Sequence, residues 1–83
     1  MKIGAGAGVE AIVQAMGGHR GSVLVQAYGC TALWILGRSN RDIQQRIKRA
    51  GAEEAVHRAI ASPDATARTK ERGQELLSRL RNV

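Results

Sequence analysis

Few residues in this sequence could do chemistry, and those that could lack the companions that the chemistry requires. His19, Cys30 and His57 could in principle supply a metal site or a thiol nucleophile, but no Asp or Glu stands at a spacing that would orient them. Glu53 and Glu54 are chain neighbours and point in different directions on a helix, so they do not form a catalytic pair. The sequence therefore predicts no enzyme activity, no metal site and no cofactor.

The N-terminal glycines do not form a dinucleotide-binding fingerprint. Gly4, Gly6 and Gly8 are spaced two and two, whereas the pattern G-x-G-x-x-G needs a longer second gap, a buried strand before it and an acidic residue about 20 positions later. Only Ile3 could belong to a strand, and a chain of 83 residues is too short for the two βαβ halves of such a fold. We expect a glycine-rich helix junction here instead of a phosphate cradle.

Positive charge is the most pronounced feature that remains. The chain has 13 Lys and Arg against 7 Asp and Glu, a formal charge of +6, and most of the excess lies in residues 38–83. The densest cluster is opposed only by Asp42 and consists of Arg38, Arg41, Arg46, Lys48 and Arg49. Such a cluster attracts polyanions by releasing their counterions, although it is also typical of a solvated helix face.

Length and composition predict one globular domain, because 43% of the residues are hydrophobic and 24% are charged in a chain of 83. No apolar run reaches the roughly 18–20 residues that a membrane span needs, and the N-terminus lacks the order of a signal peptide. The single cysteine predicts a reducing compartment, the cytoplasm or the nucleus. With one Trp, one Tyr and no Phe, the chain is poor material for stacking single-stranded bases.

The elements that must position these charges are predicted to be helices, so the fold class is all-α. An apolar stripe over 9–16 indicates the first helix, and Ser22 can cap a second one that runs to about Leu36. That second segment is apolar over most of its circumference, so we place it at the centre of the core, with Tyr28 and Trp34 packed inside. The alternative is that one of these two aromatic residues is a groove anchor for a ligand. No segment shows the alternation of a strand.

Three further helices are predicted in the basic half. Asn40 can cap a short helix that ends at Ala50-Gly51, where the glycine suits a left-handed C-cap. A narrow apolar stripe over 55–60 indicates the next helix, which Ser62-Pro63-Asp64 ends; Pro63 is expected in the first turn of the helix that follows. The last helix has one apolar side, formed by Gly73, Leu76, Leu77 and Leu80, and an opposite polar side, formed by Arg68, Arg72, Glu75 and Arg79.

The sequence matches itself at an offset of 44 residues without a gap. The identical pairs are Ile3/Ile47, Glu10/Glu54, Ala11/Ala55, Ala15/Ala59, Gly29/Gly73, Leu33/Leu77 and Leu36/Leu80, and the conservative pairs are Ile12/Val56, Met16/Ile60 and Ser22/Thr66. The matches fall at apolar-stripe and glycine positions. A period in the low forties in a helical chain is typical of armadillo and HEAT solenoids.

The segment 40–56 resembles the first two helices of an armadillo repeat, in which a short amphipathic helix ends in Ala-Gly before a second helix. The segment 25–36 resembles the third helix of such a repeat, and 3–12 resembles the Ala-Gly junction of a preceding one. This resemblance implies a short right-handed α-solenoid of about two repeats. The first would span 1–39 with a stunted first helix, and 40–83 would be a C-terminal capping repeat with a polar outer face.

Armadillo repeats bind extended peptides in a groove lined by their third helices, where an Asn holds the peptide backbone and a Trp one turn earlier walls the side-chain pockets. The matching positions here are Thr31 and Ile35, or Trp34 and Arg38 in a register shifted by three, so neither register supplies the Trp–Asn pair. The resemblance therefore implies a protein-binding module without the family's backbone clamp. Because three or more repeats are normally required to bury a continuous core, a chain with about two either self-associates through its N-terminal face or is a piece of a longer solenoid that assembles with further repeats, and we expect the second.

We expect the contact surface of such a module to be basic, and the arginines that would form it are Arg68, Arg72, Arg79 and Arg38. They suit an acidic protein or peptide and not the basic cargo of nuclear import. Two alternatives stay open. The chain could bind nucleic-acid phosphates through Arg41, Arg46, Lys48 and Arg49. It could also be a structural fragment that forms homo-oligomers through exposed solenoid ends. No membrane contact is expected.

Overall fold

The computed structural model describes residues 5–83, and this part of the chain is all-helical, which confirms the predicted class. The expectations for Ile3 and Gly4 lie outside the described residues. The helices are α1 (Ala5–Gly18), α2 (Val23–Gly37), α3 (Arg41–Arg49), α4 (Ala52–Ala61) and α5 (Ala67–Leu80). Because α1 already spans Gly6 and Gly8, the expectation of a helix junction at these glycines is wrong: they lie within a helix, and not in a turn that follows a strand.

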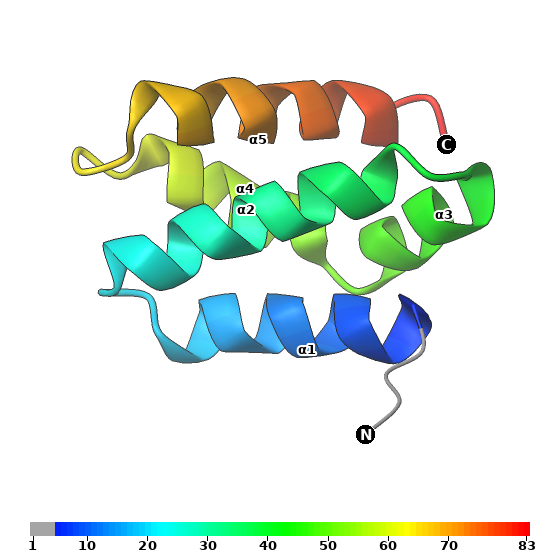
Figure 1. The fold of residues 1–83 in the computed structure, drawn as a ribbon, viewed down its shortest axis with the longest axis horizontal. Helices are drawn as coiled ribbons and strands as arrows, with labels where there is room; N and C mark the ends of the chain where they lie inside the picture. The colour runs from blue at the N-terminus through cyan, green and yellow to red at the C-terminus, as the bar shows by residue number, and fades with distance from the viewer. Residues whose placement is uncertain (1–4) are drawn as a thin grey trace.

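Helix α2 lies at the centre, as its composition predicted, and packs against α1, α3, α4 and α5. Figure 1 shows α2 between α1 and α5, with α4 behind it and α3 at one end. Helices α2 and α5 run in the same direction, whereas α1 runs in the opposite direction (Figure 1). Residues near the start of α2 therefore lie beside residues near the start of α5, and residues near the two helix ends also lie side by side.

Side chains cap three of the helices. Ser22, Asn40 and Thr66 each accept the backbone N–H of the residue three positions later, which satisfies one of the free donors of a helix N-terminus. The caps at Ser22 and Asn40 were predicted. The cap at Thr66 was not, although the 44-residue offset pairs this residue with Ser22. Gly51 has φ 83°, the left-handed conformation expected for it.

The expectation that Pro63 opens the last helix is wrong. Helix α5 begins at Ala67, and Pro63 lies in the turn that follows α4. In this turn the N–H of Ala65 donates to the carbonyl of Ser62 over 3.1 Å, and the N–H of Asp64 donates to Ser62 Oγ over 3.3 Å. Because Ser62 satisfies these donors, the chain completes a turn before Thr66 starts the helix.

One hydrophobic core receives side chains from all five helices. Its buried members are Val9, Met16, Cys30, Leu33, Ile47, Ala52, Ala55, Val56, Ala59, Leu76, Leu77 and Leu80. The expectation that both aromatic residues pack in this core is wrong. Tyr28 is 70% exposed and Trp34 is only half-buried. They lie on parts of α2 that the other described helices leave partly or wholly uncovered.

Two glycines allow their helices to pack closely, and the 44-residue offset pairs them. A Cβ at Gly29 would lie 2.5 Å from Met16 Cγ, which brings α2 close to α1. A Cβ at Gly73 would overlap Ile60 Cγ2 and lie 3.1 Å from Val56 Cγ1, which brings α5 close to α4. The pairs Gly29–Met16 and Gly73–Ile60 are therefore equivalent in structure as well as in sequence.

Gly73→Ala is expected to lower the free energy of unfolding by about 1–3 kcal/mol, because the added methyl meets the stiff β-branched side chain of Ile60. Gly17→Ala is the matched control, since nothing lies within 4 Å of its Cβ position, and it is expected to gain up to about 1 kcal/mol from helix propensity. Urea denaturation followed by circular dichroism measures both. Equal stability of the two variants would contradict the close packing of α4 and α5.

Candidate partner-binding site

Trp34 is the centre of a cluster of side chains between α2 and α5. The guanidinium carbon of Arg38, the C-cap residue of α2, lies 4.8 Å from the centroid of the Trp34 ring. The guanidinium carbon of Arg72, on α5, lies 4.7 Å from the same centroid. Cations at these distances are attracted by the quadrupole of the ring. Two arginines that are far apart in sequence are therefore held against one indole.

Polar contacts fix the rest of this cluster. Trp34 Nε1 donates a hydrogen bond to the carboxylate of Glu75, and Arg72 Nη1 donates to Thr31 Oγ1 over 3.3 Å. Arg79 Nη2 lies 4.0 Å from Glu75 Oε2, one helical turn away on α5. We call this group the Trp34 cluster; its members are Thr31, Trp34, Arg38, Arg72, Glu75 and Arg79.

The structure brings together three of the four arginines predicted to contact a partner. Arg38 and Arg72 contact Trp34, and Arg79 reaches the cluster through Glu75. Arg68 is exposed one turn before Arg72 on the same helix. Sequence reasoning assigned Trp34 a role as a ligand anchor only as an alternative, because the apolar pattern of its helix placed the ring in the core. The available signal was its indole N–H, which needs an acceptor and so favours a position near the surface.

Arg79 is held in the Trp34 cluster by one ion pair. Its single ion pair, with Glu75, is long, and its Nε is buried without a hydrogen-bond partner among the described residues. Both side chains of the pair remain partly exposed, at 37% for Arg79 and 48% for Glu75. An exposed pair of this kind is worth little. The guanidinium of Arg79 can therefore exchange Glu75 for another carboxylate at small cost.

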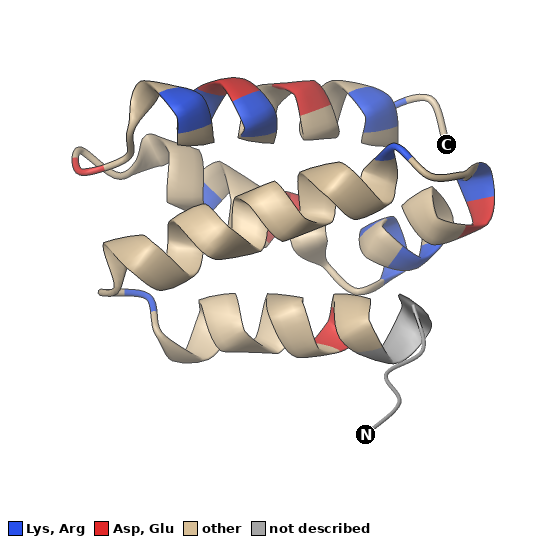
Figure 2. Cartoon of the chain, viewed as in Figure 1, with Lys and Arg blue, Asp and Glu red and all other residues tan. Residues whose placement is uncertain are grey.

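An apolar row runs along α2 beside these arginines. Leu24, Tyr28 and Ile35 are 64%, 70% and 56% exposed, and they lie on one side of the helix with Thr31. Since Thr31 accepts a hydrogen bond from Arg72, this row adjoins the arginines of α5. Figure 2 shows α2 without charge beside the charged α5.

We call these two rows together the α2–α5 ridge. Its apolar row is Leu24, Tyr28 and Ile35, and its basic row is Arg68, Arg72 and Arg79. The 44-residue offset pairs each apolar residue with one arginine, in this order. Two glutamates, Glu71 and Glu75, interrupt the basic row, and they line a shallow hollow with Trp34 and Arg72. The ridge can therefore offer apolar contacts and charge-assisted hydrogen bonds side by side.

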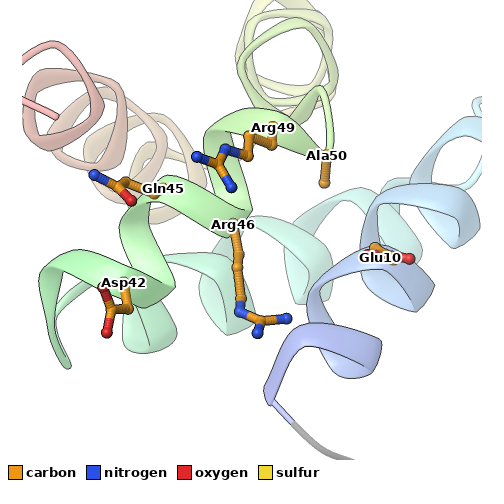
Figure 3. Close-up of a pocket in the computed structure, with 6 residues that line it drawn as sticks. All are labelled: Glu10, Asp42, Gln45, Arg46, Arg49 and Ala50. Carbon is orange, nitrogen blue, oxygen red and sulfur yellow. The ribbon is translucent and has the colours of Figure 1, made fainter.

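The alternative polyanion-binding residues do not share one face. Arg46 and Arg49 line a cleft of about 530 Å³ between α1 and α3 (Figure 3), whose other lining residues are Glu10, Asp42, Gln45 and Ala50. Lys48 turns to the end of the chain, where its Nζ donates to the carbonyl of Val83 over 3.2 Å. Arg41 is exposed at the start of α3. Two carboxylates thus offset the two arginines of the cleft.

The residues considered for catalysis remain apart from this surface. Cys30 is fully buried, and burial raises the pKa of its thiol from 9.0 to about 11, so the thiol stays protonated near neutral pH. His19, in the turn after α1, and His57, on α4, are exposed. Within residues 5–83, no three His, Cys, Asp or Glu side chains come together as metal ligands. Cys30 therefore acts as a small core residue in this fold.

Helices of the described chain are too short or too polar to cross a membrane. Comparisons with protein-family models, with curated proteins and with solved structures returned no match to this chain.

Proposed function

We propose that this chain is a non-enzymatic protein-interaction module that binds an acidic segment of a partner protein along the α2–α5 ridge. The observation that carries the proposal is the gathering of Arg38 and Arg72 against Trp34. These arginines come from different helices, yet the fold holds both guanidiniums on one ring at the surface. A basic patch that served solubility alone would not need two guanidinium groups held in fixed positions against one indole ring.

We propose further that the module consists of two armadillo-like units, residues 1–39 and 40–83. The internal match at 44 residues supports this, together with the equivalent glycine contacts of α1–α2 and α4–α5. So does the short helix α3 before Gly51, followed by two longer helices. In this arrangement α2 and α5 are third helices, and their parallel packing makes the ridge the start of a solenoid groove.

The ridge would hold its partner by two kinds of contact. Carboxylates of the partner would accept paired hydrogen bonds from the planar guanidiniums of Arg72 and Arg79. Stacking on Trp34 limits the motion of Arg72, so less rotamer freedom is lost on binding. Apolar side chains of the partner would cover Leu24, Tyr28 and Ile35. The preferred ligand is therefore a segment that alternates acidic and large apolar residues.

Fluorescence anisotropy tests this proposal with a labelled peptide rich in Glu and Leu, and with a control peptide in which Gln replaces Glu. The acidic peptide is expected to bind at about 50 mM salt and to keep part of its affinity at about 200 mM, because apolar contacts are not screened. The Gln peptide is expected to bind at least about tenfold more weakly, since charged hydrogen bonds are stronger than neutral ones. Equal binding of the two peptides would refute a role for the arginines.

A labelled oligonucleotide in the same assay tests the second candidate function. The observation that favours it is the shared cleft of Arg46 and Arg49, neither of which forms an ion pair within the described part of the chain. If the oligonucleotide binds more tightly than the acidic peptide, and its affinity collapses between about 50 and about 200 mM salt, phosphate binding replaces peptide binding. Arg46→Gln with Arg49→Gln should then remove most of that affinity.

A further inference from the structure

We propose that a second copy of this chain covers the outer face of α1 and α2, so that the protein forms a dimer with twofold symmetry. This face surrounds a hollow of about 240 Å³, and its lining residues are Ile12, Ala15, Val25, Tyr28, Gly29 and Ala32. We call it the α1–α2 face. Tyr28 belongs both to this face and to the apolar row of the α2–α5 ridge, so a dimer and an acidic peptide would share this residue. Ala15 belongs to the α1–α2 face alone, so a change at Ala15 separates the two proposals.

The internal match relates the residues of the α1–α2 face to residues of the second unit that are covered by other parts of the chain. Adding 44 to its six lining residues gives Val56, Ala59, Thr69, Arg72, Gly73 and Leu76. Five of these are buried within the chain, and the sixth, Arg72, is half-buried and reaches across to Thr31 and Trp34 of α2. The second unit is therefore covered at the positions where the first unit is open.

The opposite end of the molecule, formed by α4 and α5, carries polar residues where the first unit has nonpolar ones. A hollow on α4 and α5 is lined by His57, Ile60, Gln74, Leu77, Ser78 and Arg81. Subtracting 44 gives Val13, Met16, Cys30, Leu33, Trp34 and Gly37, most of which are apolar and buried or half-buried against the second unit. His57, Gln74 and Arg81 thus replace nonpolar residues at this end. A head-to-tail contact would bury these polar groups, which disfavours it.

The shape of the α1–α2 face suits a contact with itself. Small residues, Ala15, Gly29 and Ala32, line its hollow, and Tyr28 projects beside them with 70% of its surface exposed. Around a twofold axis, the Tyr28 of each copy can enter the hollow of the other, as isologous contacts require. In the repeat, Tyr28 occupies the place of Arg72, the residue that reaches across to the neighbouring unit.

Charge does not oppose this contact locally. Residues 21–37 contain no charged side chain, although the net charge of the chain is +6. Figure 2 shows the uncharged stretch along α2, with the basic residues on α3, α4, α5 and the loops. Raising the salt concentration screens the repulsion between the distant charges and leaves apolar contacts intact. Association is therefore expected to persist at high salt, unlike binding to a polyanion.

Sedimentation velocity on the full chain tests the proposal. The mass is expected to rise from one copy to two as the protein concentration increases from about 1 µM to about 1 mM. Ala15→Glu places a charge at an exposed helical position in the α1–α2 face, and it is expected to raise the dimer dissociation constant at least about a hundredfold. Tyr28→Ala removes the projecting ring without adding charge, and it is expected to weaken the dimer at least about tenfold.

Ser78→Glu is the matched control, because it adds the same charge at an exposed helical position on the opposite end. Circular dichroism verifies that each variant folds. A dimer that Ala15→Glu and Tyr28→Ala weaken, and that Ser78→Glu leaves unchanged, supports the twofold contact. A monomer at every concentration overturns it. Equal weakening by Ala15→Glu and Ser78→Glu also overturns it, since that result requires a head-to-tail contact.

Discussion

Leu33→Ala is expected to lower the free energy of unfolding by about 2–5 kcal/mol, the largest stability change predicted for this chain. Leu33 is fully buried on α2, the helix that packs against all the others. Its removal would leave a cavity at the point where the two halves of the chain meet, and neighbouring helices could fill that space only by moving together. Urea denaturation followed by circular dichroism gives the value.

Ile35→Ala provides the control on the same helix. Ile35 is 56% exposed, so the same kind of truncation should change the free energy of unfolding by no more than about 0.5–1 kcal/mol. A larger loss at Ile35 than at Leu33 would mean that α2 is rotated relative to the structure described here. In that case the apolar row of the α2–α5 ridge would belong to the core.

Arg72→Gln is expected to weaken binding of the acidic peptide about 10–100-fold, the largest effect predicted for the site. Arg72 is the one residue of the basic row that contacts both Thr31 and Trp34, so it is the arginine best held in position. Arg72→Lys keeps the charge and loses the planar fork, and it should fall between the wild type and Arg72→Gln. Anisotropy titrations of the labelled peptide provide the three dissociation constants.

Lys70→Gln removes the same charge from an exposed position two residues away on α5. Because residues two apart on a helix face different directions, this change should lower the affinity less than about threefold. Equal losses for Lys70→Gln and Arg72→Gln would show that net charge, and not the arrangement around Trp34, attracts the peptide. Urea denaturation of both variants separates this outcome from a loss of stability.

Periodicity predicted the helices well because the chain has a polar and an apolar side in most of them. It also identified the caps at Ser22 and Asn40, whose function depends only on the next three residues. Pro63 misled the prediction, since proline fits both a first helical turn and the turn that the structure shows. The choice between them depends on backbone hydrogen bonds to Ser62.

Two glutamines form hydrogen bonds between helices that the hydrophobic periodicity of the sequence does not predict. Gln26 is buried, and its Nε2 donates to the carbonyls of Met16 and His19 over 2.9 and 2.8 Å, which satisfies the end of α1. The Nε2 of Gln44 donates to the carbonyl of Gly37 over 2.6 Å at the end of α2. All three carbonyls lie at or just after the end of the preceding helix, so their positions depend on how the helices pack and not on local spacing.

The candidate site also has a part that the sequence predicted and a part that depends on how the helices pack. Spacing on α5 was sufficient to select Arg72 and Arg79, because it separates the polar side of a helix from its apolar side. It did not reveal that Arg38 and Arg72 meet at Trp34, which requires α2 and α5 to lie side by side. Tyr28 was placed in the core because a pattern shows which side chains are apolar, and it does not show whether this chain supplies their neighbours.

Trp34 emission tests the central claim most directly, because Trp34 is the only tryptophan in the chain and lies within the proposed site. During titration with the unlabelled acidic peptide, a saturable change in Trp34 emission is expected, with the dissociation constant that anisotropy gives. The Gln-substituted peptide at the same concentrations should produce almost no change. Binding of the acidic peptide with constant Trp34 emission would place the partner elsewhere and contradict the account.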